Sequence, residues 1–268
     1  MNNPIIDTLR NEIEGFKGEI KAEKVGHVLE VGDGIAKISG ISQVASQEML
    51  EIETDDGVAT ALAFNLEEDA VGAIVLGGVE GIKEGALVRP TGRVLSVRVG
   101  KEMIGRVVDP LGNPLDNGGP IFSKAKDENS EEVFYPVEKK APGVLARESV
   151  NAPLHTGIKA IDAIIPIGRG QRELIIGDRG LGKTAIALDT IINQKSDTRC
   201  RRPICIYVAI GQKESKVARL IATLKDAGAM EYTIIVSAPA SFASTHWYLA
   251  PYTATAIAEY FMDQGEDA

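Results

Sequence analysis

The spacing of apolar positions changes along the chain and divides it into regions with different predicted secondary structure. Between residues 23 and 98, apolar residues form short runs separated by glycines. Several short runs with glycine turns between them predict a small β-barrel or sandwich, because such a fold closes its own edges. The clearest runs are residues 28–31, 35–38, 58–62, 73–76 and 94–97.

From about residue 156 the pattern alternates between helical spacing and longer apolar runs, which predicts a doubly wound α/β core. The expected strands are residues 172–176, 204–210 and 233–236. The expected helices carry Ile158, Ile161, Ile164 and Ile165, then Val217, Leu220, Ile221 and Leu224, and finally residues 248–261. The second of these strands is almost entirely apolar, as in a strand that is covered on both faces.

The last predicted helix, 248–261, closes at Gly265, and the chain stops where a further strand is expected. The α/β core is therefore predicted to be incomplete at its carboxyl end. Without that strand we expect Leu249, Ile257 and Phe261 to be partly exposed, and the isolated chain to self-associate.

Residues 1–22 are predicted to form a separate amphipathic helix. Its apolar stripe consists of Ile5, Leu9, Ile13, Phe16 and Ile20. Such a helix either folds back on its own domain or docks on a partner. Gly15 and Gly18 weaken it, and a closed barrel offers no obvious groove, so we expect it to dock on a partner. The predicted domains are this helix, a β-barrel at 23–98 and a phosphate-loop nucleotide-binding domain at 99–268.

Composition and charge narrow the class of protein. The 268 residues are 44% apolar and 25% charged, as in an ordinary globular protein. The net charge of −9 disfavours nucleic acid as the main partner. No apolar run approaches the length of a membrane span, and the amino-terminal residues lack the features of a signal or transit peptide. Residues 100–150 are a turn-rich connection, with a solvated acidic run at 127–132.

The thiols and imidazoles suggest no metal site. Cys200 and Cys205 lack C-x-x-C spacing and fit a reducing compartment. The three histidines, His27, His155 and His246, are too scattered for a metal-ligand pattern.

One motif carries specific chemistry, the phosphate-loop pattern G-x-x-x-x-G-K-[ST]. Its residues are Gly177, Asp178, Arg179, Gly180, Leu181, Gly182, Lys183 and Thr184. An apolar run precedes the loop and a helical pattern follows it, an order that directs backbone N–H groups and a helix dipole at a polyphosphate. We expect Lys183 to reach the outer phosphates and the Thr184 hydroxyl to ligate Mg²⁺. The chain is therefore predicted to bind ATP or ADP.

A second acidic motif is missing from the predicted site. Nucleotidases of this type place an aspartate after an apolar strand, where it holds Mg²⁺ through water. Here the expected strands run instead into Gly211-Gln212 and into Ser237. The chain therefore carries half of a metal site, and it is either a fragment or a nucleotide-binding protein without turnover.

Several longer segments make the chain resemble the α subunit of the rotary, proton-driven ATP synthase. They are residues 32–36, 105–112, 142–145, 156–162, 166–174, 207–213 and 250–253. This resemblance spans essentially the whole chain and implies a small β-barrel followed by a RecA-like phosphate-loop core. Family members continue well beyond residue 268, through the acidic motif, an arginine that reaches a neighbouring site, and a helical domain.

The resemblance also implies partners and a role. It implies a non-catalytic subunit that binds ATP or ADP with Mg²⁺ and alternates with catalytic β subunits in a hexameric ring. The ring surrounds the central stalk γ, and residues 1–22 would bind the peripheral stalk δ/b. The complex would make ATP at the cytoplasmic face of the inner (plasma) membrane of a bacterium, or in an organelle, and the chain would meet the membrane only through the complex.

Gln212 distinguishes the subunit types within this resemblance. Related catalytic β subunits have a glutamate there, which positions the attacking water, whereas an amide cannot act as a base. No catalytic residue is therefore assigned to this chain, and Gln212 is expected to be a nucleotide-site residue. One departure is Gly180-Leu181, where α subunits usually have Gln-Thr.

Three other interpretations stay open at this point. A homohexameric secretion-type ATPase would need the glutamate that Gln212 replaces. A ring-shaped RNA translocase should be more basic and carry stacking aromatic residues. A truncated binding module would have no role in an assembly. The mass measured in a mixture with a β partner would distinguish this possibility from an assembling α subunit.

Overall fold

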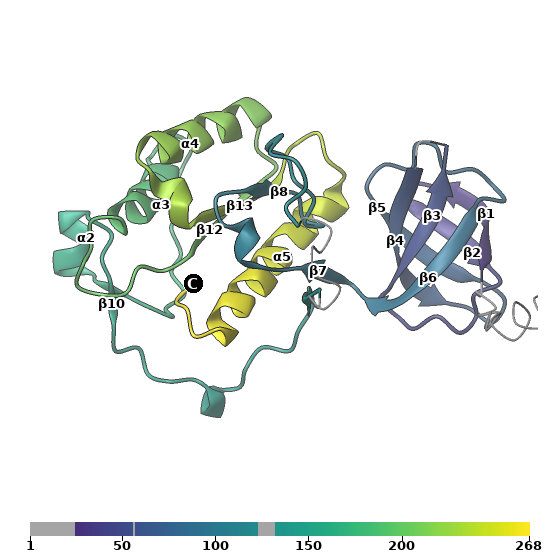
Figure 1. Cartoon of the computed structure of the whole chain (residues 1–268), viewed down its shortest axis with the longest axis horizontal. Coiled ribbons are helices and arrows are strands. Elements are labelled where there is room, and N and C mark those ends of the chain that lie inside the picture. Colours follow the sequence, from purple (N-terminus) through teal and green to yellow (C-terminus); the bar gives the residue numbers. More distant parts are fainter. Residues whose placement is uncertain (1–24, 56, 123–131) are drawn as a thin grey trace, which may run out of the picture.

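The computed structural model describes residues 25–55, 57–122 and 132–268. It shows a closed β-barrel joined to an α/β domain (Figure 1). This arrangement confirms the predicted fold class. The predicted helix at 1–22 lies outside the described residues, as does the acidic run apart from Glu132. No helix in the described ranges is long and apolar enough to cross a membrane.

The barrel consists of strands in the order β1-β2-β5-β4-β3-β6, with every neighbouring pair antiparallel. The bounds are β1 Gly26–Gly32, β2 Ile35–Ser39, β3 Glu48–Thr54, β4 Gly57–Leu66, β5 Val71–Leu76 and β6 Leu87–Val94. Alternate residues point inward and form a core that includes Ile38, Leu50 and Ile52, all fully buried. Small alanines such as Ala61 and Ala73 fill the positions between them, so the narrow interior is packed without a channel.

The predicted barrel strands are right in part. Four of the runs fall within β1, β2, β4 and β5, but the run at 94–97 does not form one strand. Val94 ends β6, and Ser96–Arg98 forms β7, which leaves the barrel and pairs with β9, Phe134–Pro136. The sequence pattern missed β3 because its glutamates alternate with the buried residues and break the apolar run.

The α/β domain contains a parallel sheet in the order β12-β13-β8. Its main elements are β8 Val107–Val108, α3 Lys183–Asn193, β12 Cys205–Ile210, α4 Glu214–Asp226, β13 Thr233–Ala238 and α5 Ser244–Asp263. The smaller ones are β10 Pro153–Leu154, α2 Lys159–Ile164 and β11 Ile167–Gly168, and the 3₁₀ turns Lys101–Met103, Val144–Ala146 and Ala229–Tyr232. The connection expected to be only turn-rich thus supplies β8, a strand of the central sheet.

The central strand β13 is buried along its whole length because helices cover both of its faces. Ile235 packs with Ile191 of α3 and Leu224 of α4 on one face. Ile234 packs on the other face with residues of α5, among them Phe261. Two covered faces are the arrangement predicted for a doubly wound core.

Three expectations about burial are wrong. Residues 172–176 form no strand, and Leu174 and Ile176 are 78% and 83% exposed, because no other described segment pairs with them. Strand β12 is only half-buried, because it lies at the edge of the sheet. By contrast, the α5 residues Leu249, Ile257 and Phe261 are buried, because α5 lies across β12 and β13 and also against β7 and β9. The apolar segment before the phosphate loop is therefore exposed, whereas the face of α5 that was expected to be exposed is buried.

The barrel and the α/β domain share a packed junction. Leu76 at the end of β5 and Leu95 between β6 and β7 are buried in the same cluster as Leu249 of α5. A cleft of about 480 Å³ beside this cluster is lined by Phe64 of the barrel and Tyr248 of α5, among others. The amino-terminal half of α5 therefore serves as the contact surface of the α/β domain for the barrel.

Candidate nucleotide-binding site

The phosphate loop leads directly into α3, and two glycines set its shape. Gly180 and Gly182 have φ angles of 86° and 87°, in the left-handed region that side-chain-bearing residues adopt at a cost. Gly182 precedes the first residue of α3, Lys183, and no side chain caps this helix end. The first backbone N–H groups of α3 and the positive end of its dipole are therefore directed at the surface where an anion can bind.

Lys183 folds back over the loop. Its Nζ donates hydrogen bonds to the carbonyl oxygens of Gly177 and Asp178, each at 2.5 Å. Residues 177–182 of the loop are exposed, and Lys183 and Thr184 are half-buried, so solvent reaches the loop. A polyphosphate would replace two carbonyl oxygens with charged acceptors, which form stronger hydrogen bonds with an ammonium group.

The chemistry of the Thr184 side chain fits a Mg²⁺ ligand. Thr184 lies in the first turn of α3, and its side chain carries a hydroxyl oxygen, the donor type that Mg²⁺ prefers. Across the part of the chain that the structure describes, no group of three or more histidine, cysteine, aspartate or glutamate residues could hold a metal ion.

Gln212 lies on a different element from the loop, two residues beyond the end of β12. In open parallel sheets, ligands bind outside the carboxyl ends of the strands. The Gln212 backbone carbonyl accepts a hydrogen bond from Ala240 N at 3.1 Å, whereas its side-chain Oε1 is buried without a partner. No hydrogen bond between described residues joins Gln212 to the loop. The eight loop residues are contiguous in sequence, whereas Gln212 comes from the turn after β12.

The sequence reasoning missed a polar network that holds the carboxyl end of α3. The carbonyl oxygen of His155 accepts hydrogen bonds from Asn193 Nδ2 at 2.9 Å and from Gln194 Nε2 at 2.8 Å. His155 Nδ1 lies 2.7 Å from Asp197 Oδ2, and Arg199 binds the other oxygen of that carboxylate. These contacts fix the helix that follows the loop.

Asp197 is the charged centre of this network. Its side chain is only 3% exposed. The hydrogen bond from Arg199 is the main cause that lowers the pKa of Asp197 to about 2, with further support from a backbone N–H and from His155. No sequence motif marks this residue, because its partners come from 42 positions earlier as well as from its own turn.

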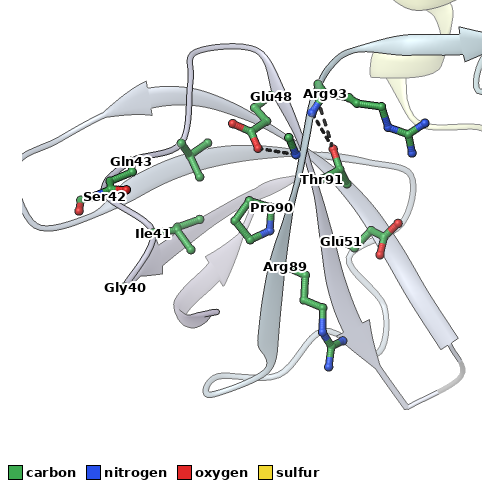
Figure 2. A pocket seen from close by; sticks show the side chains of 12 residues that line it. Gly40, Ile41, Ser42, Gln43, Glu48, Glu51, Arg89, Pro90, Thr91 and Arg93 are labelled. Atoms are coloured by element: carbon green, nitrogen blue, oxygen red, sulfur yellow. Dashed lines mark hydrogen bonds between the residues drawn. The ribbon is translucent and has the colours of Figure 1, made fainter. Parts of the chain in front are cut away.

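A separate hollow of about 900 Å³ lies on the barrel beside β6 and is open to solvent (Figure 2). Glu48, at its rim, is buried, and its two carboxylate oxygens accept hydrogen bonds from Ala45 N at 2.9 Å and Gly92 N at 2.8 Å. The Arg93 guanidinium lies 4.3 Å from the ring centre of Phe134. These polar groups hold the barrel wall together, and none of the predicted site residues lies there.

The fold and the loop together define a phosphate-loop nucleotide-binding protein with an amino-terminal β-barrel. Two family models match the chain. The model of the ATP synthase alpha/beta family, beta-barrel domain, covers residues 21–92. The model of the ATP synthase alpha/beta family, nucleotide-binding domain, covers residues 157–268. The chain belongs to the ATP synthase alpha/beta family.

Curated relatives carry a more specific name. The ATP synthase subunit alpha of Parabacteroides distasonis is 54% identical over 261 residues, which are 97% of this chain and 48% of the relative. The ATP synthase subunit alpha of Dehalococcoides mccartyi is 55% identical over 264 residues, which are 98% of this chain and 50% of the relative. The chain spans about half the length of the curated relatives it matches.

Proposed function

We propose that this chain is a nucleotide-binding, non-catalytic α subunit of a proton-driven ATP synthase, and that it binds ATP or ADP through residues 177–184. The phosphate loop carries the proposal, because its left-handed glycines and the uncapped start of α3 form an anion site at the surface. The names of the relatives support the α assignment. Gly180-Leu181 does not weaken the cradle, because backbone groups rather than side chains would hold the phosphates.

The non-catalytic part of the proposal rests on Gln212. A neutral amide at the carboxyl end of β12 can hydrogen-bond a water molecule but cannot take its proton. The nucleotide would therefore stabilise the subunit and stay intact.

The test of binding is a titration of the 268-residue chain with a fluorescent ATP analogue in the presence of Mg²⁺. Lys183→Ala removes the ammonium group that would pair with the outer phosphates, and we expect affinity to fall by about 10- to 100-fold. Lys216→Ala is the matched control, because Lys216 is an exposed lysine on α4, outside the loop. Equal affinity in the Lys183→Ala and Lys216→Ala variants would refute nucleotide binding by this loop.

Turnover is tested separately on the same preparation. We expect no release of inorganic phosphate above the background rate. Hydrolysis of ATP at about 1 per second or faster, the range of ordinary enzymes, would contradict the non-catalytic assignment. Nucleotide binding would stand even then.

Thr184 is proposed to hold Mg²⁺ beside the bound nucleotide. Thr184→Val keeps the shape of the side chain and removes the hydroxyl ligand. We expect this variant to lose the gain in affinity that Mg²⁺ confers over EDTA, whereas Thr184→Ser should keep it. If Mg²⁺ still raises the nucleotide affinity of the Thr184→Val variant, the ion is held by other ligands.

The assembly belongs to the same proposal. We expect the chain to associate with catalytic β subunits in an alternating hexameric ring around a central stalk γ, peripheral to the cytoplasmic face of the membrane. Residues 1–22 are proposed to dock on the peripheral stalk δ/b. Deletion of residues 1–20 should weaken attachment to the stalk but leave nucleotide affinity and barrel folding unchanged. A deletion variant with an unfolded barrel would assign this segment to the fold instead.

A further inference from the structure

A buried histidine lies where the barrel meets the α/β domain. His246, in the first turn of α5, is 6% exposed. Its ring lies edge-on to that of Phe242, with 5.2 Å between the ring centres. On the barrel side, a methyl group built on Gly77, just after β5, would lie 3.8 Å from Cε1 of His246. The imidazole therefore fills the space between the helix and the barrel.

The surroundings of His246 favour the neutral ring. Its Nδ1 is fully buried and has no hydrogen-bond partner. Asp109, in the turn after β8, is the charged group that acts on it. That carboxylate is already occupied, because Oδ1 accepts from Leu111 N and Asn113 N, and Oδ2 accepts from Asn113 Nδ2.

The other elements around the ring contribute no charge. The barrel offers Gly77, and the preceding turn offers Phe242. The neighbours of His246 within α5, Thr245 and Trp247, are uncharged. A proton added at Nδ1 would therefore introduce a buried charge without a hydrogen-bond acceptor, which is unfavourable.

We propose that His246 makes the junction between the barrel and the α/β domain sensitive to pH, so that its protonation loosens the contact between the start of α5 and the barrel. This inference does not depend on nucleotide binding. It uses a residue that lies outside the phosphate loop and outside the polar network around Asp197.

The direction of the effect follows from the proton balance. Burial lowers the pKa of His246, and the attraction of Asp109 only partly opposes this. Below the ordinary histidine value of about 6.5, the unfolded or opened state thus binds more protons than the closed state. The junction should keep its full stability above that value and lose stability as the pH falls below it. The opening equilibrium can rise by up to about tenfold for each pH unit within this window.

Trp247, the single tryptophan of the chain, provides a local probe. Trp247 directly follows His246 in the sequence, and its Nε1 donates a hydrogen bond to Pro239 O at 2.9 Å. We would follow its emission and its urea midpoint between pH 7.5 and 5. In the unmodified chain we expect a red shift and a lower midpoint at pH 5. His246→Leu should remove both changes, because leucine fills a similar space without a titrating group.

His27→Gln is the matched control, since it removes an exposed histidine of β1 and should leave the acid response intact. An acid response that persists in His246→Leu, or that disappears in His27→Gln, would overturn the proposal. Proton NMR titration of the imidazoles gives an independent answer if His246→Leu fails to fold. We expect the His246 signal to titrate below the ordinary histidine value of about 6.5, and titration at or above that value would also refute the proposal.

Discussion

The barrel and the α/β domain differ in how completely their strands are paired. Every strand of the barrel has two hydrogen-bonded neighbours, so no edge is left open. In the parallel sheet only β13 has a neighbour on each side, and β12 and β8 lie at its edges. The segment 172–176 has no strand partner among the described residues. An apolar run therefore becomes a buried strand only where a partner strand is present.

Two pairs of isoleucines show the size of this difference. Ile234 and Ile235 of β13 are completely buried, whereas Ile175 and Ile176 are 41% and 83% exposed. The two segments have similar local sequences, and their intrinsic strand preference is the same. Helices α3, α4 and α5 cover the first pair, and nothing comparable covers the second.

The largest effect is expected from Phe261→Ala in the α/β domain. Phe261 is 1% exposed and packs from α5 against the sheet. Its removal leaves a large cavity, which costs about 3–5 kcal/mol. Urea unfolding followed by Trp247 fluorescence measures the loss. Met262→Ala is the control, because Met262 is an exposed neighbour on the same helix. Equal effects of the two variants would mean that α5 does not pack as described.

Leu50→Ala tests the barrel in the same way. Leu50 of β3 is fully buried in the barrel core, and the cavity is expected to cost about 2–5 kcal/mol. Far-UV circular dichroism reports on barrel and α/β domain together, whereas Trp247 reports on the α/β domain. We expect the circular dichroism transition to shift more than the fluorescence transition. Identical shifts of both signals would show that the two regions unfold as one unit.

Effects of intermediate size are expected from substitutions of glycines that have a left-handed backbone conformation. Gly34, between β1 and β2, has a φ of 81°, and Gly182 of the phosphate loop has 87°. Alanine in this conformation costs about 1–2 kcal/mol. We expect Gly34→Ala to lower barrel stability without changing nucleotide affinity. Gly182→Ala should weaken nucleotide binding, which a titration with the fluorescent analogue measures. Loss of affinity in Gly34→Ala instead would contradict the independence of the two regions.

The smallest effect is expected from Ile176→Ser, because this side chain already faces solvent. Stability should change by less than about 0.5 kcal/mol. Solubility should rise, since the substitution removes an exposed apolar side chain. A loss of more than about 1 kcal/mol would indicate that segment 172–176 is buried in solution after all.

The parts of the site that are contiguous in sequence were predictable. The phosphate loop needs only its glycines, Lys183 and Thr184 in order, and a helix does begin at Lys183. The run before the loop was predicted as a strand on the same local evidence, and that prediction is wrong because strand pairing is not a local property. The turn-rich stretch around Val107 looked structureless, yet pairing with β13 makes it a strand.

Long-range polar contacts could not be predicted from the sequence pattern either. His155 and Asp197 are paired across 42 positions, and neither lies in a motif. The junction at His246 depends on Gly77 and Asp109, which come from two other regions of the chain. Spacing within one segment contains no information about such distances.

The amino-acid sequence was sufficient for local features: four of the barrel strands, the phosphate loop, the helix that follows it, and the family. The tertiary structure alone decided that α5 is buried, that segment 172–176 is exposed, and that His246 lies at the junction. The physical reason is that helices and loops satisfy their hydrogen bonds within a few residues, whereas burial and strand pairing depend on surfaces supplied by distant parts of the chain.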